Sequence, residues 1–138
     1  MKKVMLLAPE EICDRLRDVL ENKYILLPCS DACIAKEILI AKPNILILSL
    51  NLPKNSGLTF LKENRNSLPP KVIVLTAFCS IDILSELADL GVSSVIRTPC
   101  KLSSLERELK NTPPVIGRGQ TLDVRGILQC GNSEHPHL

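Results

Sequence analysis

The chain alternates short apolar runs with amphipathic windows, and this alternation constrains its fold more than any other feature. Residues 4–7, 24–27, 45–48, 72–75 and 92–96 have the length and composition of strands. Between and after them, apolar residues recur at helical spacing. Strands that alternate with helices favour a parallel sheet with right-handed crossovers. The sequence therefore predicts an α/β fold, a doubly wound five-stranded parallel sheet of flavodoxin-like order 2-1-3-4-5 with helices on both faces.

Residues near the expected helix ends support these boundaries. Ser80 can cap the fourth helix with its hydroxyl oxygen. Gly91 follows that helix where a left-handed stop is expected. In the second helix, the stripe of Ile34, Ile38 and Ala41 is predicted to face the core.

Composition narrows the class of function. Aromatic residues make up 2% of the 138 residues and there is no Trp, so bases have almost nothing to stack on. The net charge of +2 is dispersed, without the basic block of a nucleic-acid binder. The apolar run near the N-terminus ends after four residues, too short for a signal core or a membrane span. We expect a cytoplasmic protein that does not enter a membrane.

Six cysteines and two histidines raise the question of a metal or redox site. No Cys-x-x-Cys occurs, and His135 and His137 lie at the extreme C-terminus, which argues against a His-Cys metal site. Most of the cysteines are expected to be structural, like Cys13 inside a helical pattern. A redox switch at Cys29 or Cys33 stays open as an alternative.

Ligands of an open parallel sheet gather at the carboxyl ends of its strands, near the reversal in strand order. We call this edge the carboxyl rim. Its predicted residues follow the first, third, fourth and fifth strands, and they are Ala8, Pro9, Glu10, Ser49, Thr76, Thr98 and Pro99.

Three motifs on this rim resemble the response-regulator receiver domains of two-component systems. The loop SLNLP of residues 49–53, closed by Gly57, is similar to the receiver's acceptor loop. Residues 72–77 are similar to its fourth strand, which ends in a hydroxyl and a small residue. Residues 91–99 are similar to its fifth strand, with the usual Lys-Pro ending changed to Thr98-Pro99. The resemblance implies a receiver-like domain over residues 1–111, with residues 112–138 as a linker or tail.

An active receiver holds a divalent cation with an acidic pair, accepts the phosphoryl group on an aspartate, and binds its oxygens with a hydroxyl and a lysine. Phosphoryl transfer needs these groups because it depends on positioning and charge neutralisation. At the matching positions this chain has Ala8 and Pro9, then Ser49, Thr76 and Thr98, of which only Thr76 agrees. The resemblance therefore implies a degenerate pseudo-receiver without the phosphoacceptor aspartate. We expect no enzyme activity, no catalytic residue, no metal and no cofactor.

The resemblance also implies a face that binds a protein partner or a second copy of the chain. It would be built from the fourth helix, the last strand and the last helix. Its apolar residues are Ile81, Ile83, Leu84, Val95, Leu102 and Leu105. The predicted function is an atypical signalling module in a two-component or phosphorelay-type pathway, which acts through protein–protein interaction without aspartyl phosphorylation.

Two other functions are alternatives to this one. The chain could be the receiver part of a DNA-binding transcriptional regulator whose output domain is missing or reduced, so that DNA is a partner only if such a domain exists elsewhere. A flavin or nucleotide carrier is disfavoured. The segment after the first strand, residues 8–11, carries two negative charges and a proline without an amide donor, where phosphate would need donors.

Overall fold

The strands of the chain form one five-stranded parallel sheet. They are β1 (Lys3–Leu7), β2 (Ile25–Cys29), β3 (Ile45–Ser49), β4 (Lys71–Thr76) and β5 (Ser94–Arg97). Their order in the sheet is β2-β1-β3-β4-β5, which confirms the predicted fold class. This computed structural model describes residues 1–52, 56–77, 80–98 and 102–110, except for the side chains at positions 32, 33 and 102. The chain divides into two compact units between Val72 and Ile73.

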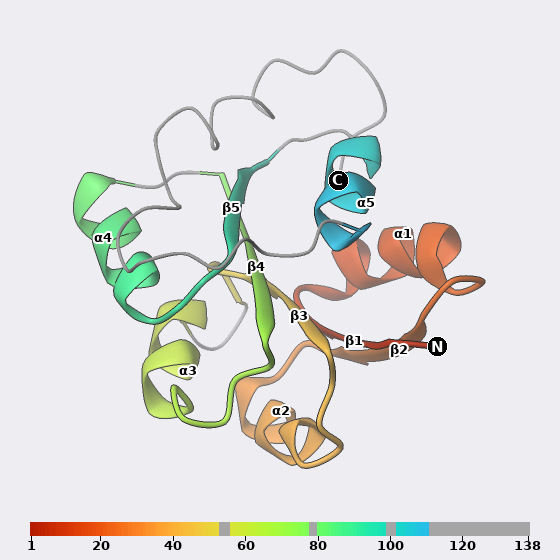
Figure 1. Ribbon diagram of the computed structural model, residues 1–138, viewed down its shortest axis with the longest axis horizontal. Helices are drawn as coiled ribbons and strands as arrows, with labels where there is room; N and C mark the ends of the chain where they lie inside the picture. Colours follow the sequence, from red (N-terminus) through yellow and green to blue (C-terminus); the bar gives the residue numbers. More distant parts are fainter. Residues whose placement is uncertain (53–55, 78–79, 99–101, 111–138) are drawn as a thin grey trace. The chain divides into compact units, whose positions relative to one another are not determined.

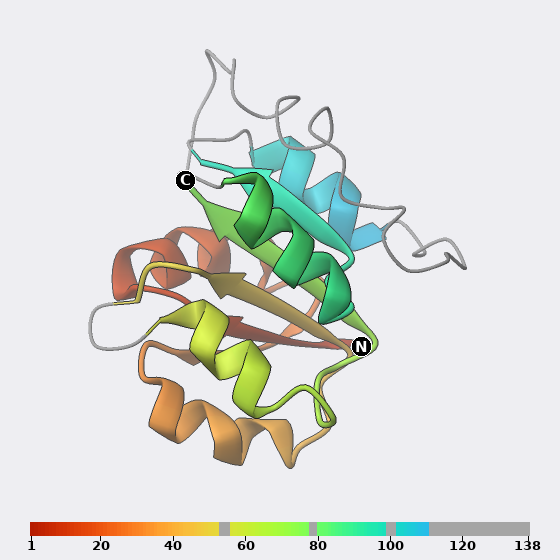
Figure 2. The same ribbon diagram turned by 90° about the vertical axis from the view of Figure 1, so that its left-hand side faces the viewer.

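The first unit contains β1, β2 and β3 with the helices α1 (Glu10–Leu20), α2 (Ala32–Leu39) and α3 (Gly57–Glu63). β1 pairs in parallel with β2 on one side and β3 on the other. Helix α1 covers one face of these strands, and α2 and α3 cover the opposite face (Figures 1 and 2). Every residue of β3 is buried, as a strand covered on both faces requires.

The second unit contains the part of β4 from Ile73 on, which pairs with β5, and the helices α4 (Ile81–Asp89) and α5 (Leu102–Lys110). The two helices lie on opposite sides of β5 (Figure 1). The hydroxyl of Ser94 donates a hydrogen bond to Glu108 Oε2 at 2.7 Å, which ties β5 to α5. None of the described helices is long and apolar enough to cross a membrane.

Helix α2 turns a different face to the core from the one that we predicted. Ile34 is 54% exposed and Ala41 is also exposed, whereas Ala35 and Leu39 are buried. Ala35 and Leu39 are four residues apart, so they too lie on one helical stripe. The small Ala35 side chain suits close packing of helix against sheet, while Ile34 is left toward solvent and Ile38 is half-buried.

Strand β2 begins one residue later than predicted and continues through Pro28. Tyr24 belongs to the turn after α1, because its N–H donates to the carbonyl of Leu20. The N–H of Ile25 and the carbonyl of Cys29 both bond to the β1 side. In a parallel ladder these bonds alternate, so Pro28 sits where an N–H would face away from β1. A proline on the open side of an edge strand costs no ladder bond and blocks pairing with another chain.

Helix α4 ends at the predicted glycine, and this ending shortens β5. Gly91 has a positive φ of 86°. The N–H of Gly91 donates to Ala88, and the N–H of Val92 donates to Leu87, the paired bonds of a Schellman motif. Since Val92 completes the helix end, β5 starts at Ser94 rather than at residue 92.

At its other end, α4 is capped by Ser80 as predicted. The Ser80 hydroxyl accepts a hydrogen bond from the N–H of Ile83 at 3.2 Å. Replacing Ser80 with Ala should lower the free energy of unfolding by about 1 kcal/mol, because a helix N–H loses its acceptor. The control is Ser85→Ala, in the exposed middle of the same helix, which should be neutral or slightly stabilising. Urea denaturation of both variants tests this, and equal losses would contradict it.

Candidate functional site

Ala8 and Ser49 leave neighbouring strands at the same level, as predicted for the carboxyl rim. Leu7 and Leu48 are partners in the parallel register of β1 and β3, and Ala8 and Ser49 are the next residues on each strand. Both residues are buried. Ala8 and Ser49 are therefore adjacent, and neither residue supplies a carboxylate.

The Ser49 hydroxyl is engaged with the backbone. It donates a hydrogen bond to the carbonyl of Asn51 at 3.3 Å, and the residue is only 7% exposed. Serine hydroxyls commonly make such local bonds at turns. Within the described part of the chain this is its one hydrogen bond, so no base that would activate Ser49 as a nucleophile is in contact with it.

The loop after Ser49 folds back onto the strand end, and Gly57 permits this approach. The N–H of Gly57 donates to the carbonyl of Leu50 at 3.0 Å, and Asn51 forms an antiparallel bridge with Ser56. A Cβ on residue 57 would lie 2.5 Å from the carbonyl oxygen of Ser49 and 2.9 Å from the Leu50 Cα. These are backbone atoms that cannot swing aside. The glycine of the predicted loop motif thus lets the start of α3 touch the end of β3.

Helix α1 begins directly after Ala8, and its first charges have a structural explanation. Pro9 is the N-cap residue and makes no side-chain capping bond. Glu10 and Glu11 are exposed in the first turn, where negative charge favours the helix dipole. Magnesium in proteins is usually held by carboxylates together with phosphate and water. Among the described residues, no three His, Cys, Asp or Glu side chains gather closely enough to hold a metal ion.

Two cysteines flank Ala8. The Cys13 thiol donates to the carbonyl of Ala8 at 3.4 Å, and the N–H of Ala8 donates to the carbonyl of Cys29 at 3.0 Å. The Cys29 thiol donates to the carbonyl of Asp31 at 2.9 Å. Burial raises the pKa of both thiols above the ordinary value. Because the thiolate is the reactive form, these surroundings disfavour a redox role for Cys29. The side chain of Cys33 lies outside the described residues.

In the second unit, Thr76 and Thr98 lie side by side. Thr76 ends β4 and is buried, and its carbonyl accepts a hydrogen bond from the N–H of Thr98 at 2.8 Å. Arg97 is opposite Thr76 in the strand register and is exposed. Pro99 lies outside the described residues.

No protein-family profile matches the chain, but solved structures do. The N-terminal domain of a nisin resistance regulator, a lantibiotic response regulator, has a TM-score of 0.69 at 22% identity, over 79% of this chain and 95% of that one. A CheY-like response regulator receiver domain protein of Methanospirillum hungatei has a TM-score of 0.73 at 19% identity, over 80% and 91%. A chemotaxis protein of Vibrio cholerae has a TM-score of 0.71 at 21% identity, over 80% and 97%.

The chain has the fold of a response-regulator receiver domain. At these identities the likeness concerns the fold, and the chemistry of the chain depends on its own rim residues. Of the rim residues that the structure describes, Ala8 has a methyl group, Pro9 a ring and Glu10 an exposed carboxylate, and Ser49, Thr76 and Thr98 have hydroxyls.

Among the described residues predicted for the partner-binding face, two have side chains that solvent can reach, Ile81 and Ile83. Leu84, Val95 and Leu105 are buried, so they pack in the core. Ile81 is 76% exposed and Ile83 is half-buried at the start of α4. The side chain of Leu102, also predicted for this face, lies outside the described residues.

Sequence reasoning missed the contact between Cys13 and the rim. It placed this thiol in a helix as a packing residue and not against the Ala8 carbonyl. The signal was available in the spacing, because a helix that starts right after the rim carries residue 13 over residues 8 and 9. The N–H of Cys13 does bond to the carbonyl of Pro9.

Proposed function

We propose that this chain is a receiver-like signalling module that acts through protein–protein interaction, without aspartyl phosphorylation and without enzyme activity. The observation that carries the proposal is the adjacent pair of Ala8 and Ser49 at the ends of β1 and β3. One offers a buried methyl group and the other a hydroxyl bound to its own loop. Acetyl phosphate with Mg²⁺ should therefore leave the intact mass of the chain unchanged.

The partner surface that we propose lies at the start of α4. The side chain of Ile81 is large, apolar and 76% exposed. Its removal from water by a partner would lower the free energy of the complex. Half-buried Ile83 lies two residues further along the first turn of α4. The proposed partner is another protein of a two-component or phosphorelay-type pathway, or a second copy of this chain.

Replacing Ile81 with Glu should weaken association of the chain with itself. The dissociation constant of the dimer should rise about tenfold or more, because an apolar contact is lost and a charge would be buried. Sedimentation velocity over a range of concentrations measures this. Ile40→Glu is the matched control, because Ile40 is 79% exposed but lies after α2. An unchanged mass distribution for Ile81→Glu, or an equal effect of Ile40→Glu, would count against the α4 surface.

A second candidate is the receiver part of a transcriptional regulator. It is favoured by one comparison, since the nisin resistance structure is the N-terminal domain of a regulator. Under this candidate, DNA binding would need an output domain, and residues 112–138 lie outside the described residues. A fluorescence anisotropy titration with duplex DNA at low salt separates the two, since the favoured proposal predicts no binding.

A further inference from the structure

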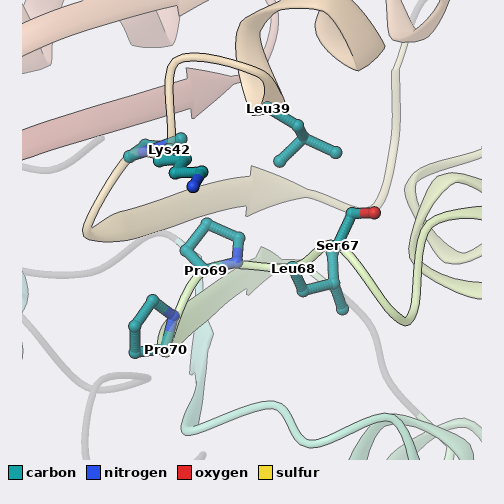
Figure 3. A pocket seen from close by; sticks show the side chains of 7 residues that line it. Leu39, Lys42, Ser67, Leu68, Pro69 and Pro70 are labelled. Atoms are coloured by element: carbon teal, nitrogen blue, oxygen red, sulfur yellow. The ribbon is translucent and has the colours of Figure 1, made fainter.

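A pocket of about 210 Å³ lies at the other end of β3 from Ser49, where no receiver chemistry is expected (Figure 3). It is formed by the end of α2 and by the segments that lead into β3 and β4. All of these residues belong to the first unit. Its apolar lining consists of Leu39, Pro43, Leu68, Pro69 and Pro70. Ser67 and Lys42 complete it, and Lys42 is the one charged residue among the lining residues.

Lys42 is held in an unusual backbone conformation. Its φ is +53°, in the left-handed region that favours glycine, and it directly precedes Pro43. The Lys42 N–H donates to the carbonyl of Leu39 at 3.0 Å and closes the end of α2. A strained backbone of this kind persists only where the surrounding structure holds it, and such residues cluster at functional sites.

The surroundings that fix Lys42 come from β1. The Lys3 ammonium donates to the carbonyl of Ala41 at 3.1 Å, and the Lys3 N–H donates to Asn44 Oδ1 at 2.9 Å. The N–H of Asn44 returns a bond to the carbonyl of Lys3 at 2.9 Å. Lys3 thus makes hydrogen bonds to residues on both sides of Lys42 in the sequence. The Lys42 side chain extends over the pocket, with the ammonium toward Leu39 and Pro69 (Figure 3).

The charge of Lys42 and the volume of the pocket together indicate which ligand the pocket would fit. Within the described part of the chain the Lys42 ammonium has no ion pair, so it can receive an anionic group. The other walls are proline rings and leucine side chains, which suit an apolar body. The volume equals roughly seven water molecules and is smaller than the usual pocket for a drug-sized ligand. We propose that this pocket binds a small aliphatic carboxylate, with the carboxylate on Lys42 and the alkyl chain against the prolines and leucines.

Pentanoate is a suitable probe, because its chain is short and its carboxylate is ionised at neutral pH. We expect a dissociation constant on the order of 1 mM or weaker, given so small a ligand. Addition of pentanoate, monitored by ¹H–¹⁵N NMR, should shift the amide signals of Leu39, Lys42 and Leu68. Pentylamine, which has the same number of carbon atoms and the opposite charge, should leave these signals in place.

Two variants test the role of the ammonium. Lys42→Gln removes the charge, keeps a polar side chain that is one atom shorter, and should raise the dissociation constant for pentanoate roughly three- to fivefold, as expected for an exposed ion pair. Lys36→Gln removes an exposed charge from α2 away from the pocket and should leave it unchanged. Overlay of the remaining amide signals shows that each variant is folded. Equal binding of pentylamine, unaltered affinity in Lys42→Gln, or no shift at all would overturn the proposal.

Discussion

Replacing Gly57 with Ala should lower the free energy of unfolding by about 2 kcal/mol. The added Cβ would meet the Ser49 carbonyl oxygen at 2.5 Å, and overpacking against fixed atoms costs about 3 kcal/mol. A gain in helix propensity of about 1 kcal/mol offsets part of this loss, because residue 57 opens α3. Urea denaturation measures the difference through the transition midpoint.

Gly91 provides the contrast, because it is a glycine for another reason. Its φ is +86°, yet nothing lies within 4 Å of a Cβ built on it. At residue 91 an Asn should therefore cost less than an Ala, since Asn tolerates the left-handed conformation. At residue 57 the order should reverse, because the larger Asn side chain adds to the clash. The same order of Asn and Ala at both positions would show that close approach does not explain Gly57.

Replacing Ser49 with Asp, the residue of an active receiver, should destabilise this chain by about 2–3 kcal/mol. The change removes the hydroxyl that donates to the Asn51 carbonyl and puts an ionised carboxylate at a position that is 7% exposed. At acidic pH the carboxyl group can protonate and donate again, so the loss should shrink. Thermal or urea denaturation at several pH values measures both effects.

Ser49→Asn is the matched control, since it has the size of Asp and keeps a donor. It should cost less than Ser49→Asp at neutral pH, and its cost should not depend on pH in the acidic range. Equal losses for the two variants at neutral pH would mean that side-chain size, and not the buried charge, decides the stability of residue 49.

The sheet could be predicted from the sequence because buried parallel strands are continuous apolar runs with strong boundaries. The helix stop at Gly91 and the cap at Ser80 were also predictable, because each position needs a particular residue type. The core-facing stripe of α2 was not. Ala35 and Leu39 share the helical spacing of Ile34 and Ile38, and only packing against the sheet decides between the two stripes.

The candidate site was predictable in part. The chain order placed Ala8 and Ser49 at the ends of strands, and the register then made them neighbours. The bond between the Thr98 N–H and the Thr76 carbonyl depends on how β5 ends, which a sequence pattern does not encode. Lys42 was missed because its left-handed backbone is imposed by Lys3 and Asn44, and Lys3 is remote in the sequence.

The most direct test of the central proposal is intact mass spectrometry after incubation with acetyl phosphate and Mg²⁺. An active receiver domain, treated in parallel, shows that the reagents work. The wild-type chain should gain no phosphoryl group, and neither should Ser49→Asp, since Ala8 and Pro9 still offer no carboxylates for the metal. A Mg²⁺-dependent phosphoryl adduct on the wild-type chain would contradict the account, and an adduct on Ser49→Asp alone would show that other residues hold the cation.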